Sequence, residues 1–126
     1  MKSILMVFLG GGAGAACRHL VGLAALRALG PNFPWGTLIV NVAGSLVMGA
    51  FIEFLVFRMP GHMEIRLLVA TGFLGGFTTF SAFSLDFLTL WQRGEHGVAM
   101  GYVGASVVLS LLAVFVGAIV TRAILQ

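Results

Sequence analysis

Long apolar segments separated by short polar connectors make up the chain. The segments cover about residues 3–28, 37–57, 65–91 and 98–124. Each has the roughly 20 residues that an α-helix needs to cross the hydrocarbon core of a bilayer. None shows the alternation of apolar and polar positions that marks a strand of a membrane barrel. The pattern therefore predicts an all-α integral membrane protein with four transmembrane helices, in a single membrane domain over residues 1–126.

The connectors between the segments are dense in residues that end helices. They read GPNFPWG at 30–36, RMPGHME at 58–64 and QRGEHG at 92–97. Proline and glycine favour turns at these places. Trp35, Trp91 and Tyr102 lie near the predicted helix ends, where aromatic side chains gather at membrane surfaces. The aromatic positions therefore support the same four spans.

The composition gives the chain little that suits a water-facing surface. Hydrophobic residues make up 60% and charged residues 9%, whereas soluble domains carry about 25% charged residues. We therefore expect the lipid bilayer to cover most of the molecule. The net charge of +3 is not gathered into a basic run or face, which argues against a nucleic-acid partner.

The basic residues are divided almost evenly between the two predicted sides of the membrane. The side of the N-terminus holds Lys2, Arg58, Arg66 and Arg122, and the opposite side holds Arg27 and Arg93, with Arg18 inside the first span. Because Lys and Arg bias sets orientation, four residues against two or three give a weak preference. The count favours insertion in both orientations and antiparallel pairing of two copies.

The third span contains the least regular stretch, GFLGGFTTFSAFS at 72–84. Adjacent glycines followed by adjacent threonines are poor helix formers, so we expect this helix to break in the middle of the membrane. A break frees carbonyls and amides that lipid cannot satisfy, and freed carbonyls bind cations in other membrane proteins. Close packing of glycine and threonine against a neighbouring helix is the alternative interpretation.

Phenylalanines and hydroxyls alternate after the predicted break. Phe80 and Phe83 share a helix face, and Thr79 and Ser81 lie beside them. An aromatic ring edge is electropositive, so ring edges among hydroxyls suit an anion path without a formal charge. Contact with lipid or with the protein core is the ordinary role of such phenylalanines and stays open here.

Two other spans carry polar side chains at depth. Asn41 lies near the start of the second span, where an amide needs a hydrogen-bond partner. Tyr102, Ser106 and Ser110 recur every four residues and form a hydroxyl stripe on one face of the fourth span. An interhelical hydrogen bond for Asn41 and bonds from the serines to their own backbone are the structural alternatives.

No set of side chains has the arrangement of an enzyme active site. The three histidines are dispersed, and no serine–histidine–aspartate set or carboxylate pair is present. Residues 10–15 match the dinucleotide pattern GxGxxA, but no acid follows about 20 positions later. The same residues place Gly10 and Gly14 on one face for close helix packing. We therefore predict that the chain is not an enzyme.

With GGGAGAACRH near its start, Asn41, and GFLGGFTTFSAFSLD in its third span, the chain resembles the Fluc (CrcB) family of fluoride channels. The resemblance covers essentially the whole chain, and GGFTTFSAFS is its most specific part. It implies an antiparallel, dual-topology homodimer in the bacterial inner membrane, with two separate fluoride pores. It also implies a structural sodium ion at the dimer interface, bound by the backbone carbonyls of Gly75 and Thr78.

The resemblance assigns roles to individual positions. Phe80 and Phe83 match the pore phenylalanines of the family, and Asn41 matches its pore asparagine. The remaining matches are Ser106 and Ser110 on the polar track, Tyr102 above it, and Arg18 as the basic vestibule or anchor residue of the first helix. Asp86 stands where relatives often carry glutamate, which leaves the role of its carboxylate open.

The implied function is passive fluoride export that relieves cytoplasmic fluoride toxicity. A proton-coupled exporter of the small multidrug-resistance type is the competing class, since such exporters are also four-span, dual-topology dimers. They need a carboxylate within the membrane, usually in the first span, and residues 3–28 contain neither Asp nor Glu. A non-transporting assembly subunit is a third possibility, favoured only by the glycine face of the first span.

Overall fold

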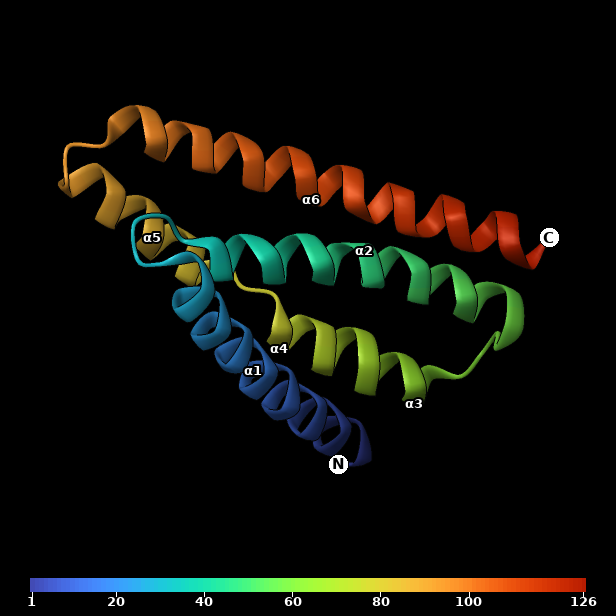
Figure 1. Ribbon diagram of the computed structural model, residues 1–126. Helices are drawn as coiled ribbons and strands as arrows, with labels where there is room; N and C mark the ends of the chain where they lie inside the picture. The colour runs from blue at the N-terminus through green and yellow to red at the C-terminus, as the bar shows by residue number, and fades with distance from the viewer.

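The computed structural model describes residues 1–126 and contains helices but no strands. The elements are α1 (Lys2–Leu29), α2 (Trp35–Arg58), α3 (Met63–Arg66), the π-helical η1 (Leu67–Leu74), α4 (Gly75–Phe77), α5 (Ser81–Gln92) and α6 (His96–Leu125). Figure 1 shows α2 and α6 running side by side, with α1 and the α3–α4 segment on the other side of α2.

Four helical segments are long and apolar enough to cross a membrane, as the sequence predicts. They are Lys2–Leu29, Trp35–Arg58, Met63–Gln92 and His96–Leu125. Three of them begin two residues earlier than expected, so that Trp35 is the first residue of α2 rather than part of a connector. Each connector contains one glycine with a positive φ, namely Gly30 (82°), Gly61 (85°) and Gly94 (80°). Glycine permits these tight connections because it has no Cβ.

The third segment is not one continuous helix. α4 ends at Phe77, Thr78 is extended with φ −84° and ψ 157°, and α5 begins at Ser81. The glycines at 75 and 76 remain helical, so the interruption falls on the residues after them. Figure 1 shows the extended connection between α4 and α5 beside α2.

Glycines bring the main chains of neighbouring helices into direct contact. A Cβ on Gly10 or Gly14 would overlap the carbonyl oxygen of Leu68 or Phe73 on the third segment. A Cβ on Gly49 would likewise overlap the Val114 carbonyl on α6. This close approach is the packing that a small-residue face permits between membrane helices, and it fixes the interrupted segment against α1.

Little of the surface is buried within one copy of the chain. Only 17 of 126 residues are buried, and the main hydrophobic cluster is formed by Leu38, Leu90, Ala99 and Tyr102. Large apolar side chains are exposed along all four spans. Because exposing so large an apolar surface to water is energetically unfavourable, lipid or another protein chain must cover it.

Candidate functional site

Asn41 connects α2 to the interruption in the third segment. Its Nδ2 donates to the Thr79 carbonyl at 2.9 Å, and the Thr79 amide donates to its Oδ1 at 2.8 Å. The side-chain amide thus satisfies both main-chain groups of a residue that lies outside any helix. Nδ2 carries two hydrogens, and the second remains without an acceptor in the chain.

The interruption leaves the main-chain carbonyls of residues 75–78 without amide donors, those of Gly75 and Thr78 among them. A continuous helix would direct the Thr79 amide to Gly75 and the Ala82 amide to Thr78. Instead the Thr79 amide bonds to Asn41, and the Ala82 amide donates to the Thr79 hydroxyl at 3.2 Å. No other amide donates to the Gly75 or Thr78 carbonyl. Their oxygens therefore remain available as acceptors or ligands.

A cavity of about 580 Å³ lies between α2, the interrupted segment and α6. Much of its wall is apolar, with Met48, Val107, Leu111 and Val114 in the lining, and we call it the polar cavity for the hydrogen-bonding side chains that it also exposes. Its lining includes Asn41, Gly75, Thr78, Thr79, Phe80, Phe83, Ser106 and Ser110. The lining contains no acidic or basic side chain. The structure therefore gathers eight of the predicted site residues around one uncharged cavity.

Ser106 is the buried polar residue of this lining. Its side chain is 6% exposed, and its hydroxyl has no hydrogen-bond partner. A buried hydroxyl without a partner costs free energy, on the order of 1–3 kcal/mol. The Tyr102 oxygen lies near this hydroxyl, and a ligand in the polar cavity that Ser106 lines would offer a further acceptor.

The two phenylalanines have different surroundings. Their ring centroids are 5.4 Å apart, with the planes tilted by 49°. Phe83 also packs against Tyr102 at 5.2 Å, whereas Phe80 is 77% exposed. Phe83 is thus held by the protomer, and Phe80 presents its ring to whatever covers the cavity from outside.

Tyr102 lies beside the polar cavity rather than in its lining. It is fully buried, and its hydroxyl donates to Asp86 Oδ2 at 3.0 Å. The hydroxyls of Thr37 and Ser106 also lie near the Tyr102 oxygen. The sequence did not reveal Asp86 as the partner of Tyr102, because the two residues lie on different helices. Ser81, a second predicted residue outside the lining, contacts the Thr79 hydroxyl at 3.4 Å.

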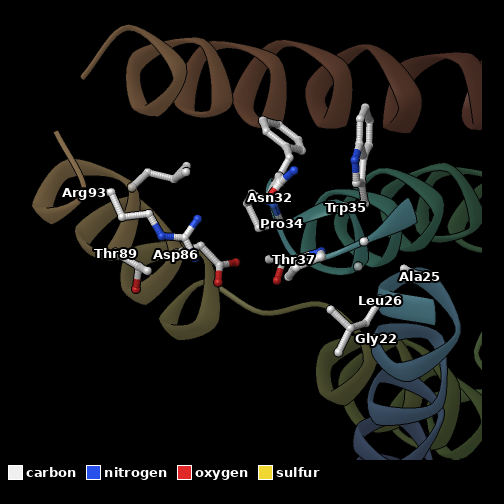
Figure 2. A pocket seen from close by; sticks show the side chains of 15 residues that line it. Gly22, Ala25, Leu26, Asn32, Pro34, Trp35, Thr37, Asp86, Thr89 and Arg93 are labelled. Atoms are coloured by element: carbon white, nitrogen blue, oxygen red, sulfur yellow. The ribbon is translucent and has the colours of Figure 1, made fainter. Parts of the chain in front are cut away.

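Asp86 faces a second, smaller space, the Asp86 cavity, of about 280 Å³. Figure 2 shows Asp86 on α5 and Arg93 just after the end of α5 lying across from Asn32 and Thr37. This cavity lies at the end of the bundle where α1 connects to α2, and it carries both an acid and a base. It therefore differs in character from the uncharged polar cavity.

Arg18 lines a third space, the Arg18 cavity, of about 340 Å³. Thr37 borders both this space and the Asp86 cavity, and Thr79 borders both this space and the polar cavity. Arg18 forms no ion pair within the chain. Its positive charge therefore has no counter-ion within the chain, and Arg18 lines the same space as Thr37 and Thr79, each of which also lines one of the other two cavities.

The fold and the polar cavity together define an integral membrane protein with an uncharged, donor-lined site among its spans. No group of histidine, cysteine, aspartate and glutamate side chains is arranged to hold a metal ion. A family model described as "CrcB-like protein, Camphor Resistance (CrcB)" matches residues 5–118. The chain therefore belongs to the CrcB-like family.

Curated relatives match over almost their entire length. A protein of Mesorhizobium japonicum named "Fluoride-specific ion channel FluC" is 53% identical over 124 residues, which is 98% of this chain and 99% of the relative. A protein of the same name from Chelativorans sp. is 57% identical over 125 residues, covering 99% and 100%. Another from Rhizobium meliloti is 50% identical over 123 residues, covering 98% of each.

Proposed function

We propose that the chain forms a fluoride-selective channel of the bacterial inner membrane, which lets fluoride leave the cell passively. The uncharged polar cavity with its unpaired Ser106 hydroxyl is the observation that carries this proposal. The names of the relatives support the same function. A channel moves ions without a chemical reaction, so the activity of the chain is transport and not catalysis.

The donors around the polar cavity suit a small, strongly hydrated anion. Fluoride must exchange its water for other donors when it enters a narrow path. The second Nδ2 hydrogen of Asn41, the hydroxyls of Ser106 and Ser110, and the ring edges of Phe80 and Phe83 supply such donors. The absence of a basic side chain from the lining favours release, because conduction requires binding weak enough for the ion to leave.

A second, antiparallel copy would complete the cavity. Phe80 lines the cavity yet is 77% exposed, so one copy leaves part of the path open to lipid. The nearly even division of basic residues between the two sides supports insertion in both orientations. In such a dimer the interruption at residues 78–80 lies in the middle of the membrane, where each copy covers the broken helix of the other.

A sodium ion would fit the free carbonyls of the interruption. Gly75 and Thr78 carry carbonyls without donors, and both residues line the polar cavity. Hard cations take oxygen ligands, and an antiparallel partner would supply the same pair of carbonyls from its own chain. A bound sodium contributes a fixed positive charge, which lowers the free energy of an anion in a low-dielectric surrounding.

Nothing in the chain favours the proton-coupled exporter. Glu53 and Glu64 are ion-paired, with Arg122 at 2.6 Å and Lys2 at 2.5 Å. Asp86 accepts from Tyr102, Glu95 lies 3.8 Å from Arg93, and none of the four acids of the chain lines the polar cavity. A carboxylate that exchanges protons must be reachable from the transport site, so we retain only the channel.

Flux measurements on reconstituted protein test the proposal. Liposomes loaded with potassium fluoride or potassium chloride are diluted into salt-free buffer with valinomycin, and ion-selective electrodes follow each anion. We expect rapid fluoride efflux and chloride efflux close to that of protein-free liposomes. Equal rates for the two anions would overturn the assignment, and so would fluoride efflux that requires a proton gradient.

A further inference from the structure

The turn between α2 and α3 borders a cavity outside the proposed fluoride site. This connector cavity measures about 300 Å³ and shares no lining residue with the polar cavity. One wall is apolar and comes from Ile52, Leu55, Val56 and Met59 near the end of α2. The rim carries His62 and Arg66. An apolar wall below a basic rim matches the acyl chain and headgroup of a lipid.

The charges around this cavity are unbalanced. The two acids at this end of the bundle are already engaged, Glu53 with Arg122 and Glu64 with Lys2. Arg66 forms no ion pair and is exposed. No acidic residue lines the cavity. A basic residue without a counter-ion at a membrane surface attracts anionic lipid.

The local main chain arranges donors around the rim. The Arg66 amide donates to the His62 carbonyl at 3.3 Å, which holds the two residues one turn apart, and both line the cavity. His62 Nδ1 lies 3.2 Å from the Met59 carbonyl, which fixes its ring at the turn. The Gly61 amide, also in the lining, donates to no acceptor in the chain. Phosphate oxygens are suitable acceptors for the guanidinium and for this amide.

We propose that the connector cavity binds one anionic phospholipid, with the headgroup phosphate on Arg66 and an acyl chain along the apolar wall. The proposal requires membrane location and does not depend on fluoride conduction. Charge complementarity selects an anionic lipid over a zwitterionic one, because Arg66 lacks a carboxylate to neutralise it. The apolar wall selects a lipid over free phosphate.

Lipid retention by purified protein tests the proposal. The protein is incubated in detergent with dioleoyl phosphatidylglycerol or dioleoyl phosphatidylcholine, and native mass spectrometry counts the bound lipid. We expect preferential retention of phosphatidylglycerol. Arg66→Gln should lower that retention about fivefold, the effect of one basic residue near an anionic surface. Arg58→Gln removes the same charge at the same end of the bundle from outside the cavity and should change retention less than twofold.

Three outcomes would overturn the proposal. Equal loss in both variants would mean diffuse attraction to the basic end rather than a site. Unchanged retention in Arg66→Gln would remove the arginine from the site. Displacement of the lipid by an equal concentration of glycerol 3-phosphate would mean that phosphate alone is recognised.

Circular dichroism verifies the fold of each variant. Fluoride efflux from phosphatidylcholine liposomes, expected to be unchanged in Arg66→Gln, separates a failure of the lipid site from a failure of the channel.

Discussion

The side chain of Asn41 pairs with the main chain of Thr79 through two hydrogen bonds of 2.9 and 2.8 Å. The pairing holds the extended residues between α4 and α5 against α2. It also orients Asn41 Nδ2, one hydrogen of which has no acceptor in the chain, beside the polar cavity. Asn41 thus supports the interruption, and under the proposed function it would also contact the anion.

Replacement of Asn41 by aspartate should impair both tasks. The carboxylate keeps an acceptor for the Thr79 amide but loses both hydrogens of Nδ2 and places a negative charge beside the anion path. We expect fluoride efflux to fall at least about tenfold, the effect of losing one hydrogen bond to a charged group. Asn32→Asp, the same change in the α1–α2 connector, is the matched control. Comparable losses in the two variants would contradict the role of Asn41.

Ser106→Ala should lower transport without lowering stability. The Ser106 hydroxyl is buried and has no partner, so its removal relieves a desolvation cost and leaves the thermal midpoint unchanged or higher. Fluoride efflux should fall severalfold, because a donor of the polar cavity is lost. Ser84→Ala is the control, since the Ser84 hydroxyl already donates to the Phe80 carbonyl at 3.0 Å. A destabilised Ser106→Ala with normal efflux would assign the residue to packing alone.

Phe80→Ile and Phe83→Ile should both reduce fluoride efflux sharply, because an aliphatic side chain has no electropositive edge. Their stabilities should differ. Phe80 is 77% exposed within one protomer, whereas Phe83 packs on Tyr102 and its loss should cost about 1 kcal/mol. Phe115→Ile, at a 64% exposed position on α6, is the control. Normal efflux in both variants would remove the phenylalanines from the path.

Gly117→Ala should destabilise the bundle, because a Cβ there would overlap the Leu46 carbonyl of α2. The two main chains must then separate, at a cost of about 1–3 kcal/mol. Gly104→Ala, on the same helix, meets nothing within 4 Å and should be neutral or slightly stabilising. Thermal unfolding in detergent, followed by circular dichroism, measures the difference. Equal midpoints would show that α2 and α6 accommodate the methyl group.

The hydrophobic pattern was enough to place the four helical spans to within about two residues at their starts. Burial requirements in lipid are uniform along a span, so composition alone locates it. The pairing of Asn41 with Thr79 could not be predicted from the sequence. A polar residue within a span indicates that it needs a hydrogen-bond partner, but it does not indicate which residue that partner is. The π-helical register of Leu67–Leu74 was equally hidden, because nothing in the residue pattern marks it.

Spacing alone was a poor guide around Tyr102. Its distance of four residues from Ser106 suggested a common hydroxyl stripe, and the two do lie near one another. Their hydroxyls nevertheless have different surroundings, because Tyr102 turns to Asp86 on α5 while Ser106 borders the polar cavity. Helical periodicity places residues on a face but does not say which neighbour each one meets.

The ion pairs Lys2–Glu64 and Arg122–Glu53 place both termini at the end of the bundle that holds the α2–α3 connector. A reporter fused to either terminus therefore samples the same compartment as a reporter fused to the other. In cells where the chain inserts both ways, each fusion would distribute its signal between cytoplasm and periplasm. Partial activity of the fused reporter enzyme on both sides of the membrane, from either fusion, would then be the expected result for this protein rather than a sign of misfolding.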